Sequence, residues 1–168
     1  PPAVRPAGLD DVDRIYDFAR EGLPVTLSIS LHAPFDELRS EIMPVNRKFS
    51  LKELIPALQD YLAATSRRIS IEYTMIRGKN DTKQCADELI RLFGGMLCHV
   101  NLIPVNNVAE RSFQKSDSAA IRQFVEYLTK HGLNATVRRE LGSDINAACG
   151  QLRKSTIEQE ENRSDRGD

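Results

Sequence analysis

The chain has 168 residues, of which 40% are hydrophobic and 28% charged, with a formal net charge of -1. The length and the hydrophobic content suffice for the core of one ordinary domain. The balanced charge excludes a uniformly basic nucleic-acid-binding surface, so RNA binding would need a local basic patch. Three scattered cysteines exclude a disulfide framework and a recognisable metal site, and the lack of a long apolar run or signal peptide predicts a cytoplasmic protein without a membrane partner.

The first part of the chain predicts a helix and a strand. Residues 1–9 are rich in proline, which indicates an irregular lead-in. Apolar residues at helical spacing then occupy positions 12–19, with Asp10 or Asp11 as the N-cap and Gly22 where the helix should end. Residues 25–31 alternate between apolar and polar side chains, which predicts a strand with one face on a core. Its polar face carries Thr26, Ser28, Ser30 and, one step further, His32.

The middle of the chain predicts a helix followed by a second strand. Residues 35–48 form a polar loop or a short helix. Ser50 and Glu53 make a capping box at the start of a strongly apolar helical stripe, in which Pro56 either kinks the helix or delays its start. Residues 69–76 alternate like the first strand. The polar face of this second strand carries Ser70, Glu72 and Thr74.

The last part predicts two more helix and strand pairs. Asp81 is positioned to cap a helix, and residues 98–104 form a third strand. Ser116 or Asp117 caps a further helix, which precedes a short fourth strand at residues 135–140.

The alternation of helices and strands predicts an α/β fold with a parallel sheet. Because the two clearest strands keep a polar face, a partial barrel fits them better than a doubly wound sheet, whose strands are apolar on both faces. Residues 10–152 form this domain, and the charged residues 153–168 predict a disordered tail. In such barrels the working residues lie at the carboxyl ends of the strands. The candidates there are Ser30, His32, residues 76–80, Asn106 and residues 138–149.

Cys149 is the first candidate for covalent chemistry. Its thiol lies among small residues and Gly150 follows it, so that another group can come close to the sulfur. Taken alone, such a cysteine is a small buried hydrophobe about as often as a nucleophile. Cys85 lies on an apolar helical stripe and Cys98 begins a strand, which indicates structural roles for both.

Other polar residues allow a functional and a structural interpretation. His32 is either a ligand or a strand-end histidine bonded to the backbone, and Asn106 alone would be a turn residue. Glu72 is expected to pair with a basic neighbour, Arg138 or Arg139, rather than to act as a catalytic base. Five basic residues form either a phosphate-contacting patch or a solvated surface: Arg39, Arg47, Lys48, Arg138 and Arg139.

Four stretches point in the same order to one family. They are LSISLHAP at residues 27–34 with its continuation to residue 48, EYTMI through ND at residues 72–81, CHVNLIPVN at residues 98–106, and VRR followed by AACGQL at residues 137–152. Together they resemble the C-terminal half of the radical SAM RNA-adenine methyltransferases of the RlmN/Cfr type, and within it most the dual-specificity RlmN branch. The resemblance covers roughly residues 10 to 152.

This resemblance implies a fold, cofactors and residue roles. The fold would be the C-terminal part of a partial (β/α) TIM-like barrel that uses S-adenosylmethionine and a 4Fe-4S cluster. Cys149 would carry the methyl group as S-methylcysteine, and a second cysteine would resolve the protein–RNA crosslink through a disulfide. Ser30, Leu31, His32 and Asn106 would contact S-adenosylmethionine. The substrate would be carbon 2 of an adenine in 23S rRNA, with tRNA as a second substrate in some members.

The chain also departs from the family pattern. It contains no CxxxCxxC cluster motif, and Asn146 stands where the family usually has Asp. The cluster ligands, the resolving cysteine and an RNA-binding domain are therefore expected in a missing N-terminal half, without which the chain would be inactive. We expect a C-terminal fragment, a split-gene half, or a decayed non-catalytic copy that retains weak RNA binding. An unrelated phosphate-binding barrel enzyme is the weaker alternative, because no Gly-rich phosphate loop supports it.

Overall fold

The computed structural model describes residues 12–105 and 113–138, which form a four-stranded sheet with helices between the strands. The strand order is β1-β2-β3-β4, and each neighbouring pair is parallel. The elements in chain order are α1 (Val12–Glu21), β1 (Ser28–Ser30), α2 (Asp36–Ile42), the 3₁₀ helix η1 (Pro44–Arg47), α3 (Leu51–Thr65), β2 (Ile69–Met75), α4 (Lys83–Phe93), β3 (Cys98–Pro104), α5 (Ser118–Lys130) and β4 (Ala135–Val137). The predicted α/β alternation and parallel sheet are confirmed.

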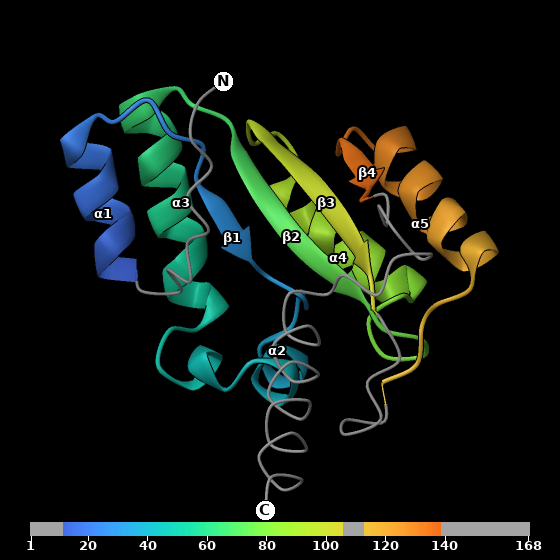
Figure 1. Ribbon diagram of the computed structural model, residues 1–168. Coiled ribbons are helices and arrows are strands. Elements are labelled where there is room, and N and C mark those ends of the chain that lie inside the picture. The colour runs from blue at the N-terminus through green and yellow to red at the C-terminus, as the bar shows by residue number, and fades with distance from the viewer. Residues whose placement is uncertain (1–11, 106–112, 139–168) are drawn as a thin grey trace, which may run out of the picture. The chain divides into compact units, whose positions relative to one another are not determined.

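One face of the sheet packs against the helices. Along β2 the residues alternate strictly between buried and half-buried, as a pleated strand with one covered face requires. The buried set includes Ile71 and Tyr73, and it forms one apolar core with residues of α1, α3, α4 and α5. In Figure 1, α4 passes behind β2 and β3, on this covered side. Tyr73 stacks on Phe124 of α5, with ring centroids 5.8 Å apart.

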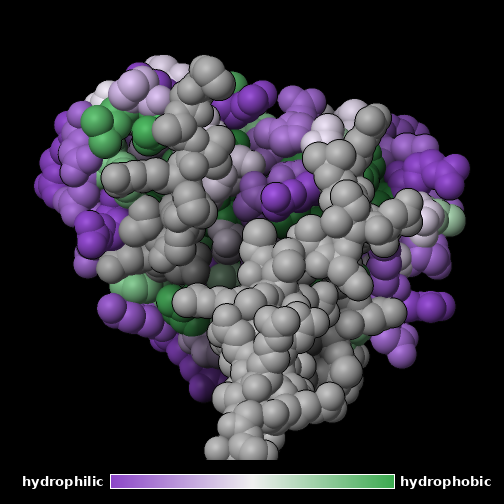
Figure 2. All heavy atoms as spheres, viewed as in Figure 1, coloured by the Kyte–Doolittle hydropathy of each residue, from purple (hydrophilic) through white to green (hydrophobic). Residues whose placement is uncertain are grey.

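The other face of the sheet carries the polar residues of the same strands. On β1 and β2 these are half-buried, in contrast to the fully buried residues between them. In the view of Figure 2, hydrophilic residues gather over the middle of this side. The polar face on which the partial-barrel prediction rests is therefore present in the structure.

The helix ends follow the local rules with one correction. Glu53 accepts a hydrogen bond from the backbone N–H of Ser50 at 3.0 Å, so the predicted capping box opens α3. Pro56 lies inside α3 and does not delay its start. Thr82, rather than the predicted Asp81, caps α4 through the N–H of Cys85. Asp117 caps α5, as one of the two predicted alternatives.

Asp81 is not a cap because its carboxylate has other partners. It accepts hydrogen bonds from the N–H of Gly78 at 2.8 Å and from the hydroxyl of Ser116 at 2.7 Å. It thereby fixes the turn after β2 to the segment before α5. Gly78 has φ +69°, in the left-handed region that suits glycine in such a turn.

The first strand is shorter than predicted. Residues 25–31 alternate, but β1 covers only Ser28–Ser30. The chain leaves the sheet at His32, whose φ of +58° lies in the left-handed region. The fourth strand covers Ala135–Val137, and residues 139 and 140 of its predicted range lie outside the described residues.

Candidate functional site

A carboxylate at the centre of the open sheet face organises its polar side chains. Glu72 lies between Ser30 of β1 and Asn101 of β3 in the sheet register. Its two carboxylate oxygens accept hydrogen bonds from Ser70 Oγ and from Asn101 Nδ2, each at 2.9 Å. Among the described residues, no ion pair joins Glu72 to Arg138. Arg139, the other predicted partner, lies outside the described residues, so that pairing stays a prediction.

The same face continues to β4 through a histidine. His99 Nε2 lies 2.7 Å from Thr136 Oγ1. Burial lowers the pKa of His99, the Arg68 guanidinium lowers it further, and the Glu72 carboxylate acts in the opposite direction. The face therefore carries a carboxylate and a ring that remains neutral near pH 7.

The segment Ser30–Leu31–His32 forms the carboxyl end of β1. Ser30 is half-buried on the open face, whereas Leu31 is completely buried in the core. Ser30 and His32 accordingly present polar groups at the strand end, and Leu31 can contribute only its backbone. Among the described residues, the Ser30 hydroxyl has no hydrogen-bond partner.

The His32 ring is held in one protonation form. Its Nδ1 accepts a hydrogen bond from the backbone N–H of Thr74 at 3.0 Å. Burial lowers the pKa of His32 to about 4, and the Arg39 guanidinium contributes in the same direction. Since Nδ1 is an acceptor and the ring is neutral, the proton resides on Nε2. Within the described part of the chain, that Nε2–H has no acceptor.

Arg39 is buried rather than exposed, which corrects its predicted place in a phosphate-contacting patch. Its side chain has no solvent exposure. It donates to the carbonyls of Leu31 at 3.1 Å, Ser30 at 3.1 Å and Phe49 at 3.3 Å, and to Asn46 Oδ1 at 2.7 Å. These acceptors lie before and after α2 in the chain, so no local sequence pattern predicts them. Of the other described members of the predicted patch, Arg47, Lys48 and Arg138 are exposed.

Asn80 is a second buried polar residue at this end of the sheet, and it lies within the predicted segment 76–80. Its Nδ2 donates to the carbonyls of His32 at 2.7 Å and Thr74 at 2.5 Å. Its Oδ1 accepts from the N–H of Ile76 at 2.7 Å. The sequence marks its position after a strand but not these contacts.

Two of the three cysteines lie in the core, in agreement with their predicted structural roles. Cys85 and Cys98 are both free and buried. Burial raises the pKa of the Cys98 thiol to about 11. Cys149, Asn106 and Arg139 lie outside the described residues, so their predicted roles stay predictions.

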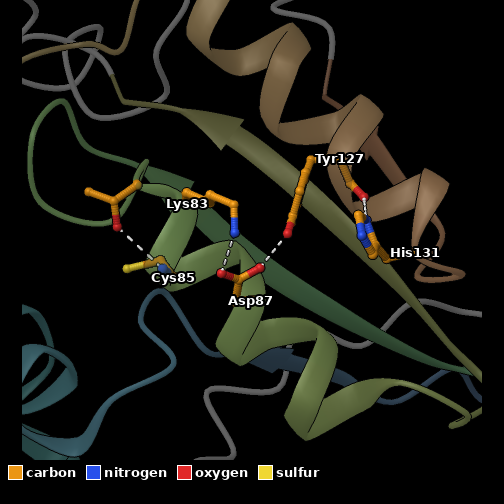
Figure 3. Close-up of polar contacts among 6 residues, drawn as sticks. Lys83, Cys85, Asp87, Tyr127 and His131 are labelled. Carbon is orange, nitrogen blue, oxygen red and sulfur yellow. Dashed lines mark hydrogen bonds and ion pairs between the residues drawn. The ribbon is translucent and has the colours of Figure 1, made fainter.

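A second polar cluster joins α4 to α5. Lys83 Nζ lies 2.8 Å from Asp87 Oδ2, and the Tyr127 hydroxyl donates to Asp87 Oδ1 at 2.5 Å (Figure 3). The Tyr127 ring packs on His131, with centroids 4.2 Å apart. A cavity of about 280 Å³ lies beside this cluster, lined by residues of both helices. Because Lys83 and Asp87 are largely exposed and already paired, we interpret the cluster as a contact between helices.

The described residues contain no group of three or more His, Cys, Asp or Glu side chains that could hold a metal ion. Among the described helices, none is both long and apolar enough to cross a membrane.

Relatives with similar sequences are RNA methyltransferases by name. No protein-family model matches the chain. Over 148 residues, or 88% of its length, it is 53% identical to the probable dual-specificity RNA methyltransferase RlmN of Caldanaerobacter subterraneus subsp. tengcongensis. Over 146 residues, or 87%, it is 49% identical to the protein of the same description from Clostridium novyi. The chain covers 43% of each of these relatives.

Two solved structures have a fold similar to that of the chain. A radical SAM methyltransferase from Sphaerobacter thermophilus matches 83% of the chain with a TM-score of 0.78 and 46% sequence identity, and the match covers 41% of that protein. A domain of a pyruvate-formate lyase-activating enzyme from Bacteroides vulgatus matches 82% of the chain with a TM-score of 0.59. Its 15% identity supports a likeness of fold alone.

Proposed function

We propose that the chain is the C-terminal portion of an enzyme that methylates RNA. The chain belongs to the RlmN type of radical SAM methyltransferases, and it spans less than half of the length of these relatives. The observation that carries this proposal is that about half of the aligned residues are identical in the chain and its RlmN relatives. The proposed substrate is carbon 2 of an adenine in 23S rRNA, with tRNA as a second substrate. We place the enzyme in the cytoplasm, where these RNAs are found.

The described residues fit a role in binding S-adenosylmethionine. When bound, this cofactor supplies the methyl group and the radical that activates it. Its amino-acid and ribose groups need hydrogen-bond donors and acceptors at the rim of the site. The Ser30 hydroxyl and the His32 Nε2–H offer such groups, and neither has a partner among the described residues. Asn106 is proposed as a third contact on the basis of the NLIP-containing stretch.

The 4Fe-4S cluster does not fit the described residues, which include no suitable group of ligands. We propose that its ligands lie in the part of the enzyme that corresponds to the uncovered length of the relatives. Cys149 is proposed as the methyl-carrying residue, because AACGQL matches the family segment around that cysteine. Cys98 is a poor candidate, because burial raises the pKa of its thiol to about 11 and disfavours the nucleophilic thiolate.

A chimeric enzyme tests the proposal. Residues 10–152 of this chain replace the matched segment of the Caldanaerobacter relative, and the chimera is loaded with iron and sulfide under anaerobic conditions. With S-adenosylmethionine and RNA, we expect methylated adenine, and mass spectrometry should locate an S-methyl group on Cys149. Cys149→Ala should abolish both products, whereas the matched control Cys85→Ala should retain them.

A folded, cluster-containing chimera with an unmodified Cys149 would contradict the proposal. That outcome would favour the second candidate function, a non-catalytic copy with weak RNA binding. The observation that favours this candidate is Asn146, which stands where the family usually has Asp.

A further inference from the structure

The hydrogen-bond ladder between β1 and β2 continues beyond the end of β1 through side chains. The last paired residues of the two strands are Ser30 and Glu72. The N–H groups of Leu31 and His32 still reach the Glu72 carbonyl, at 3.0 and 3.3 Å. Two residues further along β2, Thr74 has lost its backbone partner on this side, because the left-handed φ of His32 turns the chain away.

A buried N–H or carbonyl without a partner is costly, so something must replace the missing strand. For the Thr74 N–H the replacement is His32 Nδ1, at 3.0 Å. For the Thr74 and His32 carbonyls it is Asn80 Nδ2, at 2.5 and 2.7 Å. The ladder is thus extended by one imidazole and one carboxamide.

An asparagine matches this position atom by atom. Its Nδ2 carries two N–H donors, and two carbonyls receive them. Its Oδ1 accepts the N–H of Ile76, and its own backbone carbonyl accepts the hydroxyl of the core residue Tyr73 at 2.7 Å. Aspartate has the same shape but no donor, so it would set a carboxylate against two carbonyl oxygens.

We propose that Asn80 is a positioning residue for the cofactor site, which fixes the backbone of His32 and thereby holds the imidazole ring with its proton on Nε2. The link runs through one residue, because Asn80 binds the His32 carbonyl while the Thr74 N–H binds the His32 ring. Asn80 also donates to the Thr74 carbonyl. The same carboxamide therefore holds both residues of the hydrogen bond between the Thr74 N–H and the His32 ring. The further step, that this Nε2–H donates to S-adenosylmethionine, rests on the proposed function.

The left-handed backbone of His32 explains why an anchor is needed. A non-glycine residue at φ +58° is strained and persists only where its surroundings hold it. Without the Asn80 carboxamide, His32 can relax to an extended backbone, and the ring then leaves Thr74. Arg39 cannot substitute, because it binds the preceding carbonyls of Ser30 and Leu31.

Nuclear magnetic resonance on the complete 168-residue chain tests the positioning directly. The ¹⁵N shifts of the His32 ring report the tautomer, and a scalar coupling across the hydrogen bond links Thr74 N to His32 Nδ1. We expect the coupling and the Nε2–H form in the wild type. Asn80→Asp should lose the coupling and mix the tautomers. Asn134→Asp, an exposed asparagine, is the matched control and should change neither.

Binding of S-adenosylmethionine to the chimera described above completes the experiment. We expect its dissociation constant to rise at least about tenfold in Asn80→Asp, while Asn134→Asp leaves it unchanged. If Asn80→Asp does not fold, Asn80→Ser provides the same readouts with a smaller side chain.

A folded Asn80 variant that keeps the coupling and the tautomer would overturn the inference, as would a wild-type chain without the coupling. An intact coupling that responds to Asn80, together with a wild-type chimera that does not bind S-adenosylmethionine, would support the positioning and reject the proposed function.

Discussion

The two faces of the sheet are built from the same strands, yet different interactions stabilise them. On the covered face, β2 contributes Ile71 and Tyr73, which are fully buried in the apolar core. On the open face, the neighbouring residues Glu72 and Thr74 are half-buried. The covered face derives its stability from the removal of apolar surface from water, at roughly 25 cal/mol per Å². The open face gains little in this way, and its order comes from directional hydrogen bonds.

A strand can therefore be stabilised on one face and present polar groups on the other. Because the covered face fixes the register, the polar side chains opposite it are placed without packing of their own. Ser70, Glu72 and Asn101 then connect across two strands. Substitutions on each face should therefore affect stability and ligand binding to different extents.

The largest effect is expected from Arg39→Met, because Arg39 is a polar side chain buried as deeply as the core. Methionine fills much of the volume but leaves the Ser30, Leu31 and Phe49 carbonyls without their donor. Denaturant unfolding should show a loss of about 3–5 kcal/mol in the free energy of unfolding. The exposed Arg47→Met is the matched control and should leave stability nearly unchanged. Equal stability of the two variants would contradict the buried role of Arg39.

A pair of substitutions in β2 compares the faces themselves. Ile71→Ala removes buried methyl groups and leaves a cavity, so it should cost about 2–5 kcal/mol of unfolding free energy. Thr74→Ala, three positions further on the open face, should cost less than about 1 kcal/mol, because its hydrogen bonds to His32 and Asn80 are made by its backbone. Similar costs measured by urea denaturation would mean that the open face is packed as well.

The protonation of His32 links the open face to pH. The folded chain lowers the pKa of His32 from its usual 6.5 to about 4. Between these values the unfolded chain binds a proton that the folded chain excludes, so stability is lost as the pH falls from about 6.5 to about 4. At about 1.4 kcal/mol per pKa unit, this loss is at most roughly 3.5 kcal/mol. Urea midpoints across this range should decline less steeply in His32→Gln, whereas the exposed His131→Gln should retain the wild-type decline.

Much of the covered face could be predicted from the sequence, because it follows periodic rules. The strict alternation in residues 69–75 and the capping box at Ser50 each depend on positions close together in the chain. The strand-end position of His32 could be predicted for the same reason. The burial of Arg39 could not, because its acceptors belong to residues on both sides of α2. Similarly, the contact between Glu72 and Asn101 depends on the register of β2 against β3, which local patterning does not give.

The smallest effect on stability is expected from Glu72→Gln. Glutamine keeps an oxygen that can accept from Ser70 or Asn101 and removes only the charge, so unfolding free energy should change by less than about 1 kcal/mol. The carboxylate acts to raise the pKa of His99, so its removal should lower that pKa further, as ring shifts in a pH titration would reveal. The exposed Glu126→Gln should leave His99 unchanged. If Glu72→Gln also weakens S-adenosylmethionine binding in the chimera while stability holds, the charge belongs to the ligand site. A large loss of stability would show instead that the open face depends on this carboxylate for its fold.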